Sequence, residues 1–405
     1  MVAMVVVAEG AAWLLAPDGP ASEPEAVDEG AYFDAEQLER ARDYRGGQRA
    51  LMLAGIAAQG LVLVALVSGR PRGARSALER LGERPVVGAV AAGASLSVTV
   101  ALVALPFDVA AHERALDVGL STQSIGPWLG DFAKGTAITA ILAGAGAALL
   151  LTLMRRFPRG WWLPAAAGVV AVSAIFSWLG PVLLAPLFNR FDPLPGESPI
   201  RAEVLELGRR GGVDIGEVYR VDASRRSTAL NAYVGGLGPT KRVVLYDNLI
   251  EAAERPELRS VVAHELGHVD NDDILRGLAF VALIAPLGLL WVREAAGAMA
   301  SRAGTAPSSP AALPAYALAL ALAGFVLNVP GNQLSRDVER AADDYALELT
   351  GDPRALIDLQ RRLTTENVSD PDPPGYVELL FGTHPPTVER IGAALAYERN
   401  ESTVD

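Results

Sequence analysis

Residues 261–273 read VVAHELGHVDNDD and contain two of the chain's four histidines, His264 and His268, with Glu265 between them. In an α-helix, side chains four positions apart lie on one face, so both imidazoles can face a single ion. Glu265 leaves the helix about 100° round from His264, where its carboxylate can reach a water on that ion without binding the ion. The pattern H-E-x-x-H therefore predicts two zinc ligands and a general base on one helical turn.

The composition limits which other side chains can complete such a site. The 405 residues include no cysteine, which excludes disulfides, thiolate metal sites and cysteine nucleophiles. Any protein ligand of zinc must therefore be a His, Asp or Glu side chain. The net charge is −12 without a long basic run, which argues against nucleic acid as a partner. A polar helix that matches H-E-x-x-H by accident is the weaker explanation, because histidine is so rare here.

Long apolar stretches recur along the chain, and 51% of its residues are hydrophobic. A bilayer core about 30 Å thick needs about 20 apolar helical residues to cross it. The stretches that approach or exceed this length are 49–68, 86–106, 136–154, 161–187, 277–292 and 312–330. Residues 1–16 are a further candidate, which we interpret as a short span and not as a signal sequence. One such run also fits a buried helix of a soluble core, but so many predict a polytopic membrane protein.

The polar parts of the chain read differently. Residues 188–276 combine two β-like runs, GEVYRVDAS and KRVVLYDNLI, with the helix that carries the histidines. We therefore expect a mainly α fold, a polytopic helical membrane bundle of about seven spans with an inserted α+β zincin-like catalytic unit. The expected organisation is a bundle of about five spans at 1–187, the α+β unit at 188–276, two further spans at 277–330 and a helical segment at 331–405 that completes the zinc site.

The third zinc ligand must come from a distant segment. A catalytic zinc needs three protein ligands and one open position, and no further histidine follows within a dozen residues of His268. The helix predicted at 331–350 carries Glu339 and, four residues later on the same face, Asp343. Glu339 would bind the metal, and Asp343 would accept a hydrogen bond from a ligand histidine and fix its tautomer. On spacing alone, a charged surface helix with i,i+4 ion pairs explains this stretch equally well.

The pattern N-x-x-S-R-x-x-E-x-x-A-D at 332–343 follows HELGH by tens of residues. Together they resemble the integral-membrane zinc proteases that comprise the type I CAAX prenyl proteases and the HtpX-like heat-shock proteases. The resemblance implies a gluzincin-like zinc metalloendopeptidase that holds one Zn²⁺ per chain, with Glu339 as third ligand and Glu265 as base. Chain length and span number favour the CAAX type. Asp273 favours HtpX-like members, because CAAX-type members often have a histidine at that position.

Two further stretches extend the resemblance into the substrate site. NAYVGG, from residue 231, resembles an N-A-x-x-x-G edge strand, which implies substrate contacts by Asn231, Ala232 and Gly235. A turn before the next strand is the alternative. THPPTVERI resembles an H-P-P-x-x-x-R segment, which implies that His384 hydrogen-bonds the developing oxyanion and that Arg390 anchors this network. A capping histidine before a proline turn is the alternative.

Two looser matches lie in the connections of the bundle. Residues 107–135 and 183–194 are similar to loops of the CAAX-type members, and they contain no expected metal ligand. His112, in the first of them, is expected to be a structural loop residue and not a ligand.

The resemblance implies a membrane-embedded protease whose partners are the bilayer and a membrane-associated or lipidated peptide. Quality control of membrane proteins, as in HtpX-like members, is one alternative. A non-catalytic scaffold with a structural metal is another, although a structural site has no use for Glu265. We expect a bacterial plasma-membrane protein with the zinc site on the cytoplasmic side. Arginine-rich loops at 69–85, 155–160 and 293–311 favour the opposite orientation.

Overall fold

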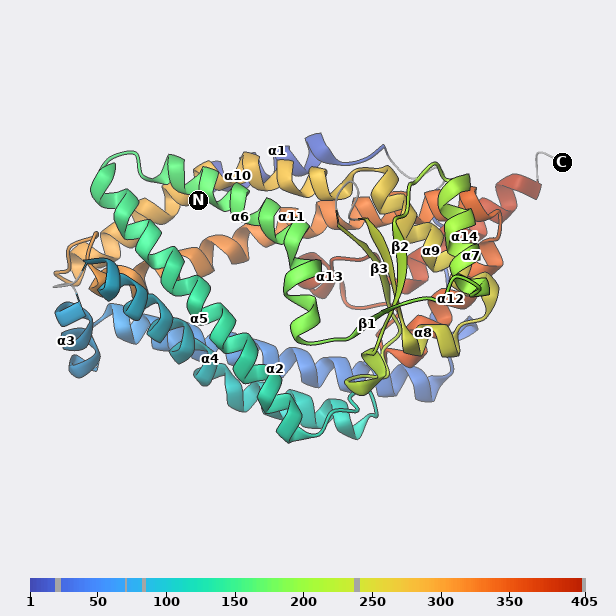
Figure 1. The fold of residues 1–405 in the computed structure, drawn as a ribbon, viewed down its shortest axis with the longest axis horizontal. Helices are drawn as coiled ribbons and strands as arrows, with labels where there is room; N and C mark the ends of the chain where they lie inside the picture. Colours follow the sequence, from blue (N-terminus) through green and yellow to red (C-terminus); the bar gives the residue numbers. More distant parts are fainter. Residues whose placement is uncertain (19–22, 70, 82–84, 237–240, 403–405) are drawn as a thin grey trace.

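The computed structural model describes residues 1–405 except 19–22, 70, 82–84, 237–240 and 403–405. Long helices form one end of an elongated molecule, and a small sheet surrounded by shorter helices forms the other (Figure 1). The long helices are α2 (Ala35–Val67), α4 (Pro85–Asp117), α5 (Ile125–Arg156), α6 (Trp162–Leu183), α10 (Asp273–Arg302) and α11 (Leu313–Thr350). In the described part of the chain, these 6 helices are long and apolar enough to cross a membrane.

The expected seventh span is a shorter helix. α1 (Val2–Leu15) has 14 apolar-rich residues, which corresponds to about 21 Å of helix against a bilayer core of about 30 Å. It packs against α10 and α11, and Arg276 of α10 donates a hydrogen bond to the carbonyl oxygen of Leu15. The short helix α3 (Arg72–Leu81) follows α2 and packs against α4.

Several helices continue beyond the apolar stretches that predicted them. α2 begins fourteen residues before its apolar run, where Asp34 and Gln37 cap each other's backbone N–H groups at 2.8 and 3.1 Å. α10 and α11 likewise run without a break through residues 276–277 and 330–331. The unit boundaries expected there coincide with a change of polarity, but hydrogen bonding along the helix backbone is unaffected by that change.

The sheet has four strands in the order β1-β2-β4-β3. The strands are β1 (Phe191–Pro193), β2 (Glu217–Val221), β3 (Ala232–Gly235) and β4 (Arg242–Tyr246). β2 and β4, the two predicted β-like runs, pair in parallel, while β1 and β3 pair antiparallel to their neighbours. β3 therefore forms an edge of the sheet next to the helix of the HELGH motif.

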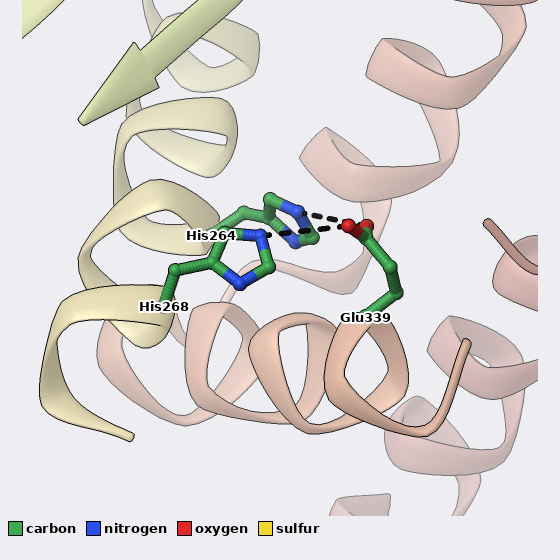
Figure 2. Close-up of side chains that lie close together, drawn as sticks. All are labelled: His264, His268 and Glu339. Atoms are coloured by element: carbon green, nitrogen blue, oxygen red, sulfur yellow. Dashed lines mark ion pairs between the residues drawn. The ribbon is translucent and has the colours of Figure 1, made fainter. Parts of the chain in front are cut away.

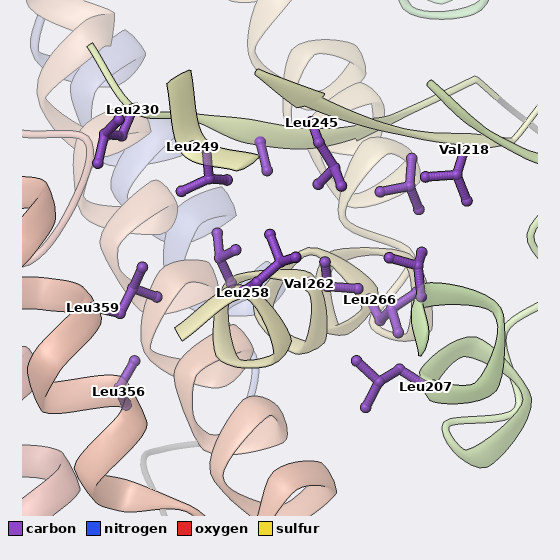
Figure 3. Packing of buried hydrophobic residues seen from close by; sticks show 14 of the residues in the cluster. Leu207, Val218, Leu230, Leu245, Leu249, Leu258, Val262, Leu266, Leu356 and Leu359 are labelled. Atoms are coloured by element: carbon purple, nitrogen blue, oxygen red, sulfur yellow. The ribbon is translucent and has the colours of Figure 1, made fainter. Parts of the chain in front are cut away.

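One face of the sheet packs on this helix. The helices around the sheet are α7 (Pro199–Arg210), α8 (Asp247–Ala252), α9 (Arg255–Asp270), α12 (Pro353–Glu366), α13 (Gly375–Phe381) and α14 (Thr387–Ser402). Val218 and Leu245 of the sheet and Val262 and Leu266 of α9 are all fully buried in the shared core (Figure 3). Each such side chain contributes roughly 1.5–3 kcal/mol, so this core fixes the rotation of α9 about its axis.

The segment between α1 and α2 crosses the C-terminal helix. The backbone N–H of Glu25 donates to the carbonyl oxygen of Gly392 in α14 at 3.0 Å, and Arg399 pairs with the Glu25 carboxylate at 2.8 Å. A Cβ atom on Gly392 would overlap the carbonyl oxygen of Glu25. The close crossing therefore requires glycine at this position.

We expect Gly392→Ala to lower the free energy of unfolding by about 1–3 kcal/mol, because the added methyl group must displace the crossing segment. Thermal unfolding in detergent measures the effect. Gly46→Ala is the matched control, since a Cβ atom at that helical glycine meets no neighbouring atom within 4 Å. Equal unfolding midpoints for the two variants would show that the crossing is not tightly packed.

Candidate metal centre

The two histidines of the opening motif lie one turn apart on α9, on the side away from its core residues. Their rings approach edge to face, with centroids 4.8 Å apart and an interplanar angle of 85°. Because Val262 and Leu266 anchor the opposite side of α9, both rings face α11 (Figure 2). The i,i+4 spacing thus brings the two imidazoles together as predicted.

Glu339 of α11 reaches both histidines (Figure 2). Its Oε2 lies 3.3 Å from His264 Nε2, and its Oε1 lies 3.6 Å from His268 Nε2. One potential ligand atom from each of the three side chains lies within 4.8 Å of the others. The helix predicted at 331–350 therefore brings Glu339 to the two histidines. Spacing alone did not distinguish this arrangement from a charged surface helix.

These three side chains fit a zinc ion in number, chemistry and spacing. Two imidazole nitrogens and one carboxylate oxygen form a catalytic donor set that leaves one position open. Zinc–ligand bonds of about 2.0–2.1 Å in a tetrahedron place neighbouring ligand atoms about 3.4 Å apart, close to the separations observed. Glu339 Oε2 is also buried, and no described donor makes a hydrogen bond to it. A bound cation would satisfy that oxygen.

Each histidine is oriented by a carboxylate, which in turn contacts an arginine. His264 Nδ1 lies 2.9 Å from Asp343 Oδ1, and Arg390 donates to both Asp343 oxygens, at 2.5 and 2.7 Å. Both Nδ1 atoms are thereby committed to acids, because His268 Nδ1 lies 2.9 Å from Asp273. This leaves the Nε2 atoms free to face a metal.

The contact between Asp273 and His268 was not predicted from the sequence. Asp273 is the first residue of α10, and Arg276 donates to its Oδ1 at 3.2 Å. The chain enters α10 through Asp272, which has a left-handed backbone with φ of 53°, a conformation that aspartate tolerates better than most residues. An acid five positions after the second histidine was the available signal, but its contact depends on the turn at Asp272.

The environment of His264 and Glu265 shifts their proton affinities. Burial lowers the pKa of His264, but the hydrogen bond to Asp343 and the adjacent Glu339 carboxylate outweigh it and raise that pKa to about 10. Metal binding therefore has to displace a proton. Burial raises the pKa of Glu265 above its ordinary value, which brings this carboxylate closer to the range suited to a general base.

Glu265 faces the edge strand. The backbone N–H of Val234 in β3 donates to Glu265 Oε2 at 3.3 Å, so the predicted base lies between the three potential ligands and the sheet edge. Asn231 Oδ1 accepts a hydrogen bond from the N–H of Ala232 at 2.9 Å. The Ala232 side chain is buried in the core, and Gly235 pairs with Arg242 of β4. Ala232 can therefore meet a substrate through its backbone only.

His384 contacts Glu339, whereas Arg390 contacts Asp343. His384 Nε2 is 3.3 Å from Glu339 Oε1, and its Nδ1 is 3.0 Å from Thr383 Oγ1. Its side chain is 60% exposed, so it borders the open side of the centre. Arg390 was expected to anchor the His384 network, but its described hydrogen-bond contacts are with Asp343 and with His264 Nδ1, the latter at 3.4 Å.

The polar residues of the second motif position the turn that carries His384. Asn332 and Ser335 donate to the carbonyl oxygens of Leu380 and Thr383, at 3.0 and 2.8 Å. Arg336 donates to the carbonyl oxygens of Glu378 and Gly382, at 3.0 and 2.7 Å. These side chains lie on one face of α11 through i,i+3 and i,i+4 spacing. That spacing is visible in the sequence, but their partners in the turn are not.

An apolar cavity lies within the bundle. Its volume is about 1130 Å³, and residues of α2, α4, α5, α6, α10 and α11 line it, among them Leu63, Leu96, Leu150, Val169 and Leu318. His112 lies elsewhere and is not part of the metal-binding group. Its buried ring stacks on Trp128, with centroids 4.8 Å apart, but it lies within helix α4 and not in the expected loop.

Comparison with known proteins links both parts of the chain to the same class. The family model described as "Peptidase family M48" matches residues 197–398, and the model described as "CAAX prenyl protease N-terminal, five membrane helices" matches residues 22–190. The crystal structure of S. mikatae Ste24p has a similar fold, with a TM-score of 0.80, 21% identity and coverage of 97% of this chain and 96% of that one.

Two relatives illustrate the range of similarity. The "uncharacterized metalloprotease YhfN" of Bacillus subtilis is 29% identical over 94% of this chain and 91% of its own length. A "protease HtpX homolog" of Tropheryma whipplei is 31% identical over 46% of this chain and 68% of its own length. The similarity therefore includes both types named in the sequence analysis.

We expect Asp273→Asn to weaken zinc binding by about 10–100-fold, because His268 loses the charged acceptor that orients its ring. Competition with a chelator of known zinc affinity measures the change. Asp272→Asn is the neighbouring control, since the Asp272 side chain makes no capping hydrogen bond. Unchanged zinc affinity in Asp273→Asn would remove Asp273 from the centre.

Proposed function

The chain belongs to peptidase family M48 and is an integral-membrane metalloprotease, and from this premise we propose that it is a zinc endopeptidase acting on membrane-associated or lipidated peptides. His264, His268 and Glu339 hold one Zn²⁺. The observation that carries the proposal is the convergence of these three side chains beside Glu265 and the sheet edge.

The chain's own residues divide the work of peptide hydrolysis. When bound, zinc supplies Lewis acidity and lowers the pKa of a water toward about 7. Glu265 takes the proton of the attacking water and passes it to the leaving nitrogen. His384 donates a hydrogen bond to the oxygen of the tetrahedral intermediate, a contribution typically on the order of 3 kcal/mol. Arg390 acts more remotely, by holding Asp343 against His264.

The substrate adds a strand to the open edge of β3. Asn231, Ala232 and Gly235 border that edge, and an extended peptide gains affinity from backbone hydrogen bonds there. The apolar cavity between the spans supports a lipidated or membrane-embedded substrate, because its lining suits hydrocarbon better than water. Asp273 and the HtpX homolog support quality control of membrane proteins as the second candidate.

We expect Glu265→Gln to retain zinc while its peptide cleavage falls by about 10²–10⁴-fold, the usual contribution of a general base. Zinc is measured by elemental analysis, and cleavage by mass spectrometry on one peptide with and without a farnesyl group. Preference for the farnesylated peptide supports the first candidate, and indifference supports quality control. A wild type that binds zinc without cleaving either peptide would leave the scaffold alternative standing.

The bacterial plasma membrane and the cytoplasmic side remain the proposed location of the zinc unit. The orientation follows the resemblance, whereas arginines at the far end of the bundle, such as Arg155 and Arg159, favour the reverse. In the cysteine-free chain, a membrane-impermeant maleimide should label Arg159→Cys in intact cells and leave Glu197→Cys unlabelled. The opposite labelling pattern would place the zinc unit outside the cytoplasm.

A further inference from the structure

A second cluster of polar side chains lies where the membrane bundle meets the sheet, outside the metal centre. Asp131 of α5 accepts hydrogen bonds from Gln123 at 2.8 Å, from Lys134 at 3.0 Å and from Arg226 at 3.0 Å. Arg226 also donates to Asn189 Oδ1 at 3.0 Å. The cluster thus joins the stretches 107–135 and 183–194, which resemble CAAX-type members, to the segment that precedes β3. Neither stretch contributes a residue to the metal centre.

Backbone contacts reinforce this joint. Ser121 and Ser227 form an isolated antiparallel β-bridge between the α4–α5 connection and the segment before β3. On either side of it, the N–H of Thr122 donates to Arg226 and the N–H of Thr228 donates to Leu120, at 3.1 and 3.0 Å. In Figure 1 the α4–α5 connection lies beside the turn below the strands.

The same segment is fixed at its other end. Asn367 accepts a hydrogen bond from the N–H of Leu230 at 2.8 Å and donates one to the carbonyl oxygen of Leu230 at 3.2 Å. Arg45 of α2 in turn donates to the carbonyl oxygens of Asn367 and Val368, at 2.6 and 2.8 Å. Residues 226–230 are therefore held by groups from the α4–α5 connection and α5, and by Asn367, which Arg45 of α2 holds in turn.

The edge strand begins directly after this segment. β3 has only four residues, pairs with β4 on one side, and presents the Val234 N–H to Glu265. Its distance from the metal centre thus depends on where residues 226–230 are held. Asp131 and Arg226 have side chains only 17% and 21% exposed, and partly buried ion pairs of this kind add little net stability but favour one arrangement over others.

We propose that Asp131, Arg226 and Asn367 are positioning residues. They hold the edge strand at the distance from the metal centre that lets an extended peptide reach Glu265. They touch neither metal nor substrate and act through β3. The inference rests on the protease function proposed above. Because an extended peptide gains affinity from backbone hydrogen bonds along the strand, loosening the joint weakens binding of a peptide that pairs along β3 more than binding of one too short to pair.

The test compares Asp131→Asn and Arg226→Gln with wild type on a long peptide and on a shortened peptide containing the same scissile bond. We expect KM for the long peptide to rise about tenfold, with unchanged zinc content and a smaller effect on the short peptide. Asp192→Asn is the matched control, since it breaks the exposed Arg190–Asp192 pair of 2.9 Å at the other edge of the sheet. Equal losses on both peptides, or no change in KM, would overturn the proposal.

A disulfide tests the joint by closing it covalently, in exchange for the hydrogen bonds that the Ser121 and Ser227 hydroxyls donate to the carbonyl oxygens of Arg226 and Leu120. Opposed residues of an antiparallel bridge have Cα atoms about 4.5–5.5 Å apart, within disulfide range, so Ser121→Cys with Ser227→Cys can cross-link it. The chain has no other cysteine to interfere. Oxidation should leave wild-type activity unchanged and restore the KM of Asp131→Asn. Inhibition by oxidation would mean that the two segments must separate during turnover, which contradicts the proposal.

The proposed function and the joint fail in different ways. If the wild type binds zinc but cleaves neither peptide, the protease proposal fails. If the wild type cleaves both and the variants keep its KM, the protease proposal stands and the positioning role is rejected.

Discussion

The close contact between α9 and α11 is the constraint on which the centre depends. A Cβ atom at Gly267 would lie 3.1 Å from the Ala342 Cα and 3.2 Å from the Tyr345 Cβ, closer than side chains normally pack. Glycine between the two histidines therefore lets α11 approach until Glu339 and Asp343 meet the imidazoles. Gly267 of HELGH thus sets the helix separation, and His264, Glu265 and His268 supply the chemistry.

The α9–α11 contact also joins the centre to the bundle. α11 carries Glu339 and Asp343 near one end and cavity-lining residues near the other, and α10 starts at Asp273, the acid that faces His268. Two long membrane helices thus supply both a potential metal ligand and the acids that orient the histidines, without an intervening linker. The joint at Asp131 and Arg226 adds a third connection, to the sheet edge.

The sequence predicted the features that depend on local spacing. The i,i+4 histidines, the Glu339–Asp343 pair, the apolar helices and the two inner strands follow from periodicity or motif, and the structure places them as expected. The contact of Asp273 depends on one left-handed residue. The contact of Arg390 with Asp343 was not predicted, because the path of α14 is not local. The joint combines residues far apart in the chain, such as Asp131 with Arg226 and Leu230 with Asn367, which no periodic pattern encodes.

Because α11 is unbroken, it also fixes the distance between the bilayer and the metal centre, and therefore which peptide bonds the centre can reach. About nine helical residues separate the end of its apolar run at Pro330 from Glu339, a rise of at most about 14 Å above the hydrocarbon. An extended chain covers that distance in about four residues. Peptide bonds far from the bilayer surface must therefore be drawn toward it, whereas those next to a lipid anchor or a membrane exit point are already within reach.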